Sequence, residues 1–528
     1  MSSAVPAPPP CLADGFALLH QPQRALAIAR AARLADPARL DARLLEGAAC
    51  KALGAFEDAI AAFRAVLAAD PLRAGVAVSL ANALAEAGAC QPASLREAAE
   101  WLRYALALRP DLAAAHASLI ELLSRLDDRA ALEEACHAAL AHDPGMVAAH
   151  QQLAALLGGR GAMADAAHHR HAAWGRQRLF IAAAPQASPR VLVLLGTGEG
   201  NIPLRYLLPG SRYTLLKWLI DAVPEKEWEA EIAALPDHDL VLNAIGEPEL
   251  EAGALAAVAR FAAGSTQPLL NPPAALAPTR RERLAAHLDG IADLVVPVTH
   301  PVAAGCAAPA GEWLFRPLGA HGGDGLVRHA GPAPQPGHVT AFHDFQSADG
   351  GYRKYRAIFI DRVPYPYHLA IADTWLVHYY TAGMAARPDR RAEEARFLAD
   401  PPSAIGASAW AAVAAIGARL DLDYAGIDFS ILADGRVLVF EANATMVVHP
   451  EAPDGPFAFK NAAVGRILAA FDLMLALRRA KRAGDIGAKR AGDIGAKRAR
   501  NIGAQHAADA TAQRAGDIHT PPAVTVGA

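Results

Sequence analysis

A proline recurs through the first 150 residues at a nearly constant step, and this period is the strongest constraint on the fold. The prolines are Pro37, Pro71, Pro110 and Pro144, at intervals of 34, 39 and 34 residues. Each closes an alanine-rich amphipathic stretch, such as 56–71 (FEDAIAAFRAVLAADP). Proline suits the first turn of a following helix, because its missing N–H has no partner there in any case. Since one such unit cannot bury its apolar face alone, the sequence predicts an all-α repeat array.

Small residues accompany this period. Gly54, Ala59 and Ala62 fall where two antiparallel helices are expected to approach closely. Together with the 34-residue step and the terminal proline, they make residues 14–175 similar to the tetratricopeptide repeat family. The resemblance implies a concave groove that binds a peptide, a protein or a partner subunit. A plain helical scaffold or dimerisation module is the alternative, because the groove residues specify no ligand.

The composition changes at residue 189. The apolar run 190–195 (RVLVLL) ends in glycines, which is typical of a buried parallel strand and its turn. A second strand is expected at 239–243, so residues 189–275 are predicted to form a small α/β layer. Asn243 and Glu247 follow that strand at the edge where open sheets usually bind ligands, although ordinary loop residues are an equally good interpretation.

Two apolar runs joined by Asp434-Gly435 are typical of an antiparallel hairpin. Alternate residues of a strand share a face, so Glu441 and Asn443 point the same way, and pairing about the turn brings Asp428 across from them. Three oxygen-bearing side chains without imidazole or thiolate favour Mg²⁺ or Mn²⁺ over zinc. The sequence therefore predicts a metal site formed by this trio. An ordinary hairpin with a polar face is the alternative.

Two further segments carry groups suited to phosphate. Arg316 ends a predicted strand and precedes a glycine-rich loop, in which backbone N–H groups can approach phosphate oxygens closely. The glycines of that loop are Gly322, Gly323 and Gly325. Lys354 and Arg356 are two residues apart on another predicted strand and so share a face. Apolar residues follow Arg356 directly, which favours a core strand; exposed cations on an edge strand are the alternative.

Together these elements resemble the ATP-grasp superfamily over residues 190–475, the group that includes D-alanine–D-alanine ligase and glutathione synthetase. The family pattern places Glu thirteen residues after the metal Asp and Asn two beyond it, and both intervals are met here. The resemblance implies an α+β ATP-grasp domain over 276–475, preceded by an α/β pre-ATP-grasp domain over 189–275. It also implies ATP and two Mg²⁺ ions, or Mn²⁺, as cofactors.

The same resemblance assigns roles to individual residues. Arg356 and Lys354 would be catalytic, because they would offset phosphate charge during transfer. Arg316 and the glycines of a flap at 319–325 would bind the nucleotide. Phe342 stands in the place of an adenine neighbour, and Asp344 in the place of a ribose partner.

The acceptor pocket has weaker signals. The segment 368–380 is rich in polar aromatic side chains, which can orient a substrate. We expect His368 and Asp373 to border the substrate. His378 could act as a base, although a hydrogen-bonded core histidine is the commoner outcome. Neither the carboxylate nor the amine substrate is specified by these residues.

The sequence departs from the family pattern in places. Arginine stands where lysine is usual, at Arg316 and at an upstream position that is Arg280 or Arg281. Many members have an arginine two residues before the metal Asp, and here that position is Gly426. A transition-state cation would then come from the strand that carries Arg356.

Charge and composition limit the partners. The chain has 50 Lys+Arg and 54 Asp+Glu, a net charge of −4, which makes it a poor candidate for nucleic-acid or anionic-membrane binding. Five widely spaced cysteines form no CxxC pair and fit a reducing cytoplasm, where we expect the protein. Residues 1–13 resemble no signal peptide and are expected to be disordered, as is the low-complexity tail 478–528 with its eight-residue repeat.

The sequence thus predicts a multidomain protein: an all-α tetratricopeptide solenoid, an α/β layer, an α+β ATP-grasp domain and a disordered tail. The functional hypothesis is an ATP- and Mg²⁺-dependent ligase that activates a carboxylate as an acyl-phosphate for attack by an amine or another nucleophile. In this hypothesis the repeat array binds a peptide or protein. The alternative is a non-catalytic nucleotide-binding or scaffold protein in which the array mediates protein–protein interaction.

Overall fold

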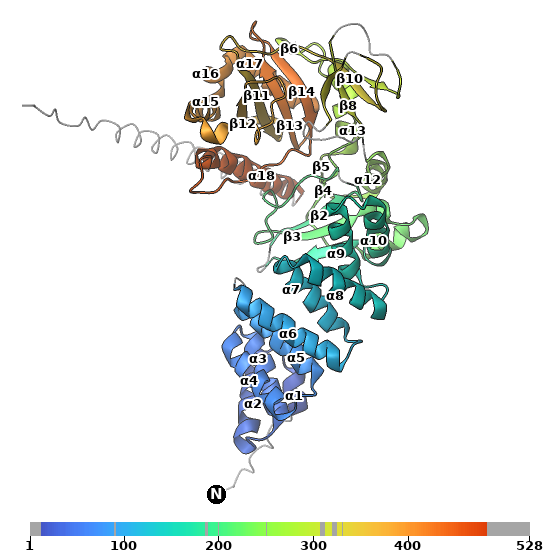
Figure 1. Ribbon diagram of the computed structural model, residues 1–528, viewed down its shortest axis with the longest axis vertical. Helices are drawn as coiled ribbons and strands as arrows, with labels where there is room; N and C mark the ends of the chain where they lie inside the picture. The colour runs from blue at the N-terminus through green and yellow to red at the C-terminus, as the bar shows by residue number, and fades with distance from the viewer. Residues whose placement is uncertain are drawn as a thin grey trace, which may run out of the picture. The chain divides into compact units, whose positions relative to one another are not determined.

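A computed structural model describes residues 12–88, 91–184, 188–198, 200–249, 251–306, 312–318, 325–329 and 331–482. The chain divides into two compact units, Met1–Gln177 and Arg178–Ala528. Within the described residues the first unit is helical, and the second combines helices with three sheets (Figure 1).

The first unit is a succession of helices, each packed against the next. They are α1 (Leu12–Ala17), α2 (Pro22–Ala35), α3 (Leu40–Ala52), α4 (Phe56–Ala69), α5 (Ala74–Ala87), α6 (Pro92–Leu108), α7 (Ala113–Arg125), α8 (Arg129–His142), α9 (Val147–Gly159) and α10 (Met163–Arg176). α4 and α5 have 14 residues whereas α6 has 17, and this extension takes up part of the longer interval between Pro71 and Pro110. The N-terminal unit is a helical solenoid consistent with tetratricopeptide repeats.

The periodic prolines lie in the turns that precede α3, α5, α7 and α9, and not in the first helical turn as predicted. In two repeats the proline carbonyl is bonded to a histidine of the following helix. The Pro110 oxygen accepts a hydrogen bond from the buried His116 ring at 2.8 Å, and the Pro144 oxygen accepts one from the buried His150 ring at 3.0 Å. In these repeats the turn is held to the following helix through the proline carbonyl.

Glycines of the array differ in their roles. Gly54 has a φ of 77° in the turn after α3, in the left-handed region that favours glycine, so it serves the turn and not a helix contact. The close approach of α3 and α4 depends instead on Gly47, where a Cβ would lie 2.6 Å from the Phe63 ring.

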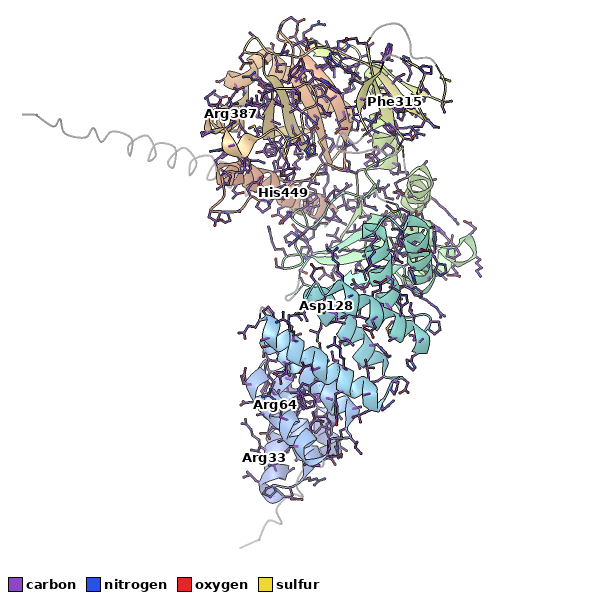
Figure 2. The ribbon with its side chains drawn as sticks, viewed as in Figure 1. Arg33, Arg64, Asp128, Phe315, Arg387 and His449 are labelled. Atoms are coloured by element: carbon purple, nitrogen blue, oxygen red, sulfur yellow. The ribbon has the colours of Figure 1, made fainter. Side chains whose placement is uncertain are left out.

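Asp128 caps α8, because its carboxylate accepts the Ala131 N–H at 3.2 Å (Figure 2).

The second unit begins with a mostly parallel sheet in the order β1-β3-β2-β4-β5. Its strands are β1 (Leu179–Ala182), β2 (Arg190–Leu195), β3 (Thr214–Leu219), β4 (Leu240–Asn243) and β5 (Leu269–Leu270), with β1 antiparallel at the edge. Helices α11 (Trp228–Ala234) and α12 (Ala252–Gly264) belong to this layer. The run 190–195 forms β2, and its four central residues are buried, as expected for a parallel strand.

Two antiparallel sheets follow. One has the order β7-β10-β8-β9 and the other β12-β11-β13-β14-β6, with β6 parallel to β14. The strands are β6 (Leu294–Val295), β7 (Thr299–Val302), β8 (Trp313–Pro317), β9 (Val327–His329), β10 (Gly337–Ala341), β11 (Tyr352–Ile360), β12 (Val363–Ala372), β13 (Tyr424–Ile431) and β14 (Val437–Asn443). Phe315 lies at the centre of β8 and is buried (Figure 2).

Helices cover the second antiparallel sheet: α15 (Pro388–Ala399), α17 (Ala407–Leu420) and α18 (Asn461–Arg482) pack against β12, and α18 also against β11 (Figure 1). The remaining helices are α13 (Pro273–Leu276), α14 (Arg281–His287) and α16 (Pro401–Ile405). Single 3₁₀ turns are η1 (Ile220–Ala222), η2 (Glu225–Glu227), η3 (Ala277–Thr279), η4 (Met384–Ala386) and η5 (Ala458–Lys460). Helices α15 and α17 contact Tyr355 and Phe359 on one face of the sheet, whereas Phe471 of α18 contacts Tyr424, which lies on the other face.

The β13–β14 hairpin forms about the Asp434-Gly435 turn as predicted, with Gly435 at a φ of 86°. Its register sets Asp428 opposite Glu441 and Gly426 opposite Asn443. On the other side of β13, Arg356 of β11 is opposite Asp428. Three charged residues thus follow one another across three adjacent strands.

The predicted start of the C-terminal tail differs from the end of the last helix. The sequence predicts the tail from residue 478, but α18 continues to Arg482. Its last turn is held because Arg478 Nη2 donates to Asp361 at 2.6 Å and to the buried Asp423 at 3.0 Å. Residues 1–11 and 483–528, on which the predicted disorder falls, lie outside the described residues. In the part of the chain that the structure describes, no helix is both long enough and apolar enough to cross a membrane.

Candidate functional site

A cavity of about 460 Å³ lies between the two antiparallel sheets of the second unit. One wall comes from β7, β8 and β10, and the other from β11, β13 and β14. The predicted site residues that line it are Arg316, Phe342, Lys354, Arg356, His378, Asp428 and Glu441. These positions span 126 residues of sequence, and the two sheets bring them to one place.

The polar side of the cavity is organised around Asp428, which is fully buried. Arg356 grips its carboxylate with two hydrogen bonds, Nε to Oδ1 at 2.6 Å and Nη2 to Oδ2 at 2.9 Å. Lys354 Nζ lies 2.6 Å from Oδ2. Burial alone would raise the pKa of Asp428, but the two cations hold that pKa far below its usual range. Asp428 is therefore a carboxylate, and both cations are committed to it.

Glu441 faces a second arginine. Arg281 Nη2 lies 3.7 Å from Glu441 Oε2, and Arg281 Nη1 donates to Glu249 Oε2 at 2.6 Å. Arg281 lines the cavity, whereas Arg280 is bonded to Glu282 and to the Pro248 carbonyl. Of the two upstream arginines that the sequence offers, the cavity contains Arg281.

Arg316 extends from β8 into the same cavity and makes no ion pair with a described residue. Burial lowers the pKa of its guanidinium, and the nearby Glu441 carboxylate opposes that effect. Together with Lys354 and Arg356, Arg316 presents positive charge from both sheets to one space. Such a space can hold a multiply charged anion.

The opposite side of the cavity is apolar and aromatic. The rings of Phe342 and Trp375 are 5.9 Å apart, nearly perpendicular, and both line the cavity. The Arg328 guanidinium carbon lies 3.6 Å from the Phe342 ring centroid. Such surfaces can pack against a flat aromatic group.

Several predicted residues lie elsewhere. Asp344 is exposed and accepts the Gln346 N–H at 3.1 Å, so it closes a turn and does not line the cavity with Phe342. Asn443 does not line it either, because its Oδ1 accepts from the Thr445 N–H at 3.0 Å and from the Thr445 hydroxyl at 3.1 Å. Such local side-chain-to-backbone bonds compete with other uses of an asparagine.

The predicted acceptor residues separate. Asp373 is exposed and paired with Arg390, and it does not border the cavity. His368 is opposite Arg356 on β12 but is buried, stacked on Tyr379 with ring centroids 4.7 Å apart. Burial holds the pKa of His368 well below its usual range, so the ring is neutral. His378 lines the cavity, and its buried Nδ1 has no hydrogen-bond partner among the described residues.

Tyr379, which covers His368, also serves a buried carboxylate. Its hydroxyl donates to both oxygens of Glu394, each at 3.1 Å. Burial raises the pKa of Glu394 to about 7. Part of this aromatic stretch therefore packs in the interior and does not face the cavity.

Two glycine positions bear on the predicted phosphate contacts. Gly322 and Gly323 lie outside the described residues, and Gly325 has a φ of 63° in a position where a Cβ would be 2.8 Å from Pro317. At Gly426 a Cβ would be 2.5 Å from Met446 Sδ and 3.1 Å from the Ala357 carbonyl oxygen. No larger side chain fits there without displacement of its neighbours.

Sequence reasoning missed a second group of polar residues beside the cavity. Glu249 follows β4, Glu282 lies in the first turn of α14, and His338 is on β10. Burial lowers the pKa of His338, so its ring is neutral. Glu247, which the sequence places at the end of a strand, is buried with one carboxylate oxygen unpartnered among the described residues, and burial raises its pKa to about 7. No motif spacing connects these residues; only the fold brings them together.

No protein-family model and no curated protein matches the chain. Among solved structures, MamA is 20% identical over 31% of this chain and 93% of its own, with a TM-score of 0.28. A thermophilic TPR protein of Thermus thermophilus, TTC0263, is 21% identical over 31% of this chain and 89% of its own, with a TM-score of 0.26. PilF of Pseudomonas aeruginosa is 19% identical over 31% and 74%, with a TM-score of 0.29. These matches lie in the helical array and do not reach the cavity.

Proposed function

We propose that the second unit is an ATP-grasp ligase, which uses ATP to activate a carboxylate for attack by an amine or another nucleophile. The observation that carries this proposal is the succession Arg356, Asp428 and Glu441 across three strands, inside a cavity closed on its other side by a second antiparallel sheet. The spacing of the carboxylates along the chain is the family's own.

In this proposal the aromatic side of the cavity receives the adenine, and the polar side receives the triphosphate. Phe342 and Trp375 supply apolar contact for the base. Lys354, Arg356 and Arg316 supply positive charge from two directions for the phosphates.

The donor set fits Mg²⁺. Asp428 and Glu441 are directly opposite each other, and Asn443 is two residues further along β14. Both Asp428 oxygens are bound by Arg356 and Lys354, so one of these bonds would have to be replaced by the ion. Hard oxygen donors without imidazole suit Mg²⁺. Bound there, Mg²⁺ would neutralise phosphate charge and hold the γ-phosphate in line with the attacking oxygen. Asn443 would need to give up its bonds to Thr445 to take part.

The proposed reaction has two steps. A substrate carboxylate oxygen attacks the γ-phosphorus and ADP leaves, which gives an acyl-phosphate. The amine nitrogen then attacks the acyl carbon, phosphate leaves, and the amine loses a proton. Lys354 and Arg356, which lie together at Asp428, stabilise the negative charge of the transferring group.

For the helical array we propose a peptide or protein partner. A solenoid of this type has a long concave surface on which a polypeptide can bind. One version of the proposal is that the array holds a polypeptide whose carboxylate or amine is modified by the second unit.

One observation favours the non-catalytic alternative. Gly426 stands where many family members carry an arginine, and that position has no room for a side chain. In the alternative, the cavity binds nucleotide and the array mediates interactions, but no transfer takes place. In the ligase proposal, catalysis would depend on Arg356. It lies on β11, the strand next to Gly426, and could supply the positive charge that the family's arginine supplies.

The test is calorimetric titration of the full-length protein with ATP, with and without Mg²⁺, followed by ADP release with panels of carboxylates and amines. Glu441→Gln should abolish the Mg²⁺-dependent part of ATP binding. Asp434→Asn is the matched control, because Asp434 lies in the turn of the same hairpin and is exposed. Absence of any nucleotide binding by the wild type would overturn the proposal, and ADP release that requires a carboxylate would exclude the scaffold.

A further inference from the structure

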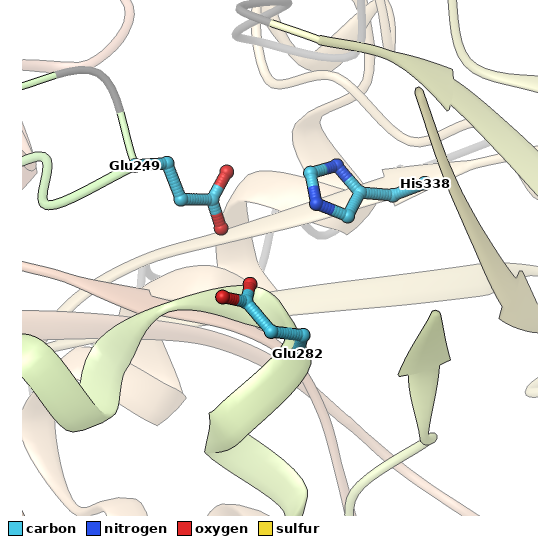
Figure 3. Close-up of side chains that lie close together, drawn as sticks. All are labelled: Glu249, Glu282 and His338. Atoms are coloured by element: carbon cyan, nitrogen blue, oxygen red, sulfur yellow. The ribbon is translucent and has the colours of Figure 1, made fainter. Parts of the chain in front are cut away.

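Beside the cavity, three side chains from separate segments converge. Glu249 comes from the loop after β4, Glu282 from the first turn of α14 and His338 from β10. One ligand atom of each lies within 4.8 Å of the others. Figure 3 shows both carboxylates and the imidazole directed toward a common point.

The histidine is the unusual member of this group. His338 is 6% exposed, and no hydrogen bond joins its ring to any described residue. A buried imidazole that faces two carboxylates and makes no hydrogen bond has a ring nitrogen available for a ligand. A metal ion satisfies all three groups at once.

Glu282 adds a second unsatisfied atom. Its Oε1 accepts from Arg280 at 2.6 Å, whereas its Oε2 is buried without a hydrogen-bond partner in the described part of the chain. Glu249 accepts the Arg281 backbone N–H through Oε1 at 2.8 Å, and pairs with its guanidinium through Oε2. One oxygen of Glu282 is therefore free to bind, and one of Glu249 is held only by a side chain that has another partner nearby.

The local charge is close to balance. The carboxyl groups of this region are Glu247, Glu249, Glu282 and Glu441, and the cations that face them are Arg280, Arg281 and Arg316. The carboxyl groups outnumber the cations by one, and Glu247, whose pKa burial raises to about 7, is only partly charged. Arg281 already lies 3.7 Å from Glu441, so it can move to that carboxylate when a metal ion takes the Glu249 oxygen.

We propose that Glu249, Glu282 and His338 form a binding site for a divalent transition-metal ion of the Zn²⁺ class. One imidazole with two carboxylates is a donor set that Zn²⁺ accepts, and it differs from the all-oxygen set that suits Mg²⁺. No residue is shared with the trio Asp428, Glu441 and Asn443. At Zn–ligand distances near 2.1 Å, ligand atoms are about 3.5 Å apart, so the side chains need to draw together by roughly 1 Å.

The ion would join β10 to α14 and to the loop after β4. Because His338 and Arg281 both line the cavity, it would also fix one part of the cavity wall. With three protein ligands, it would keep a coordination position for water or for a ligand in the cavity.

The experiment is titration of metal-stripped full-length protein with Co²⁺, followed by absorption, and with Zn²⁺ by calorimetry, in the absence of nucleotide. We expect one ion per chain and a tetrahedral or five-coordinate Co²⁺ spectrum. Loss of an outer-shell partner alone typically costs 10–100-fold in affinity, so His338→Ala and Glu282→Gln should each weaken binding by about 100-fold or more.

His343→Ala is the matched control, because His343 also lines the cavity but is not in the cluster, and it should bind as the wild type does. Failure to bind either ion below about 1 mM overturns the site, as does wild-type affinity in both variants. Should His338→Ala fail to fold, Glu282→Gln decides alone. Since no nucleotide is present, a negative result leaves the proposed ATP site unaffected, and a failed ATP titration leaves this site unaffected.

Discussion

Asp428→Asn is the substitution that most sharply tests the electrostatics of the cavity. In the wild type, Lys354 and Arg356 are both held at 2.6 Å by the Asp428 carboxylate, which is fully buried. Asparagine keeps the shape and removes the charge. Both cations are then free to turn toward an anion.

The magnitude follows from Coulomb's law. A phosphate drawn to Lys354 and Arg356 approaches Asp428 to within about 6 Å, and at an effective dielectric of about 20 two unit charges at that distance repel by about 3 kcal/mol. Water in the cavity reduces this by about half, which leaves about 1.4 kcal/mol. Asp428→Asn should therefore tighten metal-free ATP binding about tenfold, and should abolish the further gain that Mg²⁺ gives to the wild type.

The assay is isothermal titration with ATP in EDTA and again in excess Mg²⁺, with Asp434→Asn as the control. The substitution also unpairs two cations, so we expect the second unit to lose about 3 kcal/mol of stability, which thermal unfolding without ligand measures. Weaker metal-free binding by Asp428→Asn, with a folded protein, would refute the reasoning, because it would mean that Asp428 positions the cations for phosphate instead of competing for them.

Three further predictions concern other parts of the second unit. Gly426→Ala should destabilise it by about 1–3 kcal/mol in urea unfolding, because the new Cβ meets Met446 Sδ at 2.5 Å; wild-type stability would mean that Met446 moves at no cost. Phe342→Ala should weaken ATP binding about fivefold and leave tripolyphosphate binding unchanged, and an equal loss for both ligands would contradict its role beside the base. Glu394 has a folded-state pKa of about 7, above the ordinary value of 4.5, so its protonated form stabilises the fold at low pH and that stability is lost as pH rises from about 4.5 to 7. Glu394→Gln should therefore flatten the fall in melting temperature between pH 5 and pH 7.5. An unchanged profile would show that other groups cause this fall.

The part of the cavity that follows from strand geometry was predictable. An Asp-Gly turn fixes the register of a hairpin, and the alternation of side chains then sets Asp428 opposite Glu441. The same alternation places Lys354 and Arg356 on one face. Asn443 satisfies the same rule but is drawn to Thr445, two residues away, because asparagine readily bonds to nearby backbone.

Other residues depended on contacts that no local pattern records. The sequence predicts His368 at the substrate because it is a polar aromatic residue, yet Tyr379 of the same segment stacks on it and covers it. The family pattern leaves Arg280 and Arg281 as alternatives, and only the fold shows that Arg281 lines the cavity. His338 reaches the cavity from another element, and no pattern in the sequence marks it. In the array, the 34-residue period predicts the helices, but it does not reveal the histidine bonds to the proline carbonyls that hold two of the turns.

The contact between the end of α18 and the sheet has a practical consequence for anyone who shortens this protein. Asp423 is buried, and its carboxylate is shared by Arg478 at 3.0 Å and Arg362 at 2.9 Å. A variant cut after residue 482 keeps both guanidinium groups on that acid. A variant cut after residue 477, where the repetitive sequence begins, loses Arg478. Asp423 then keeps only one of its two arginine partners, and the ion pair between α18 and Asp361 in the β11–β12 turn is lost.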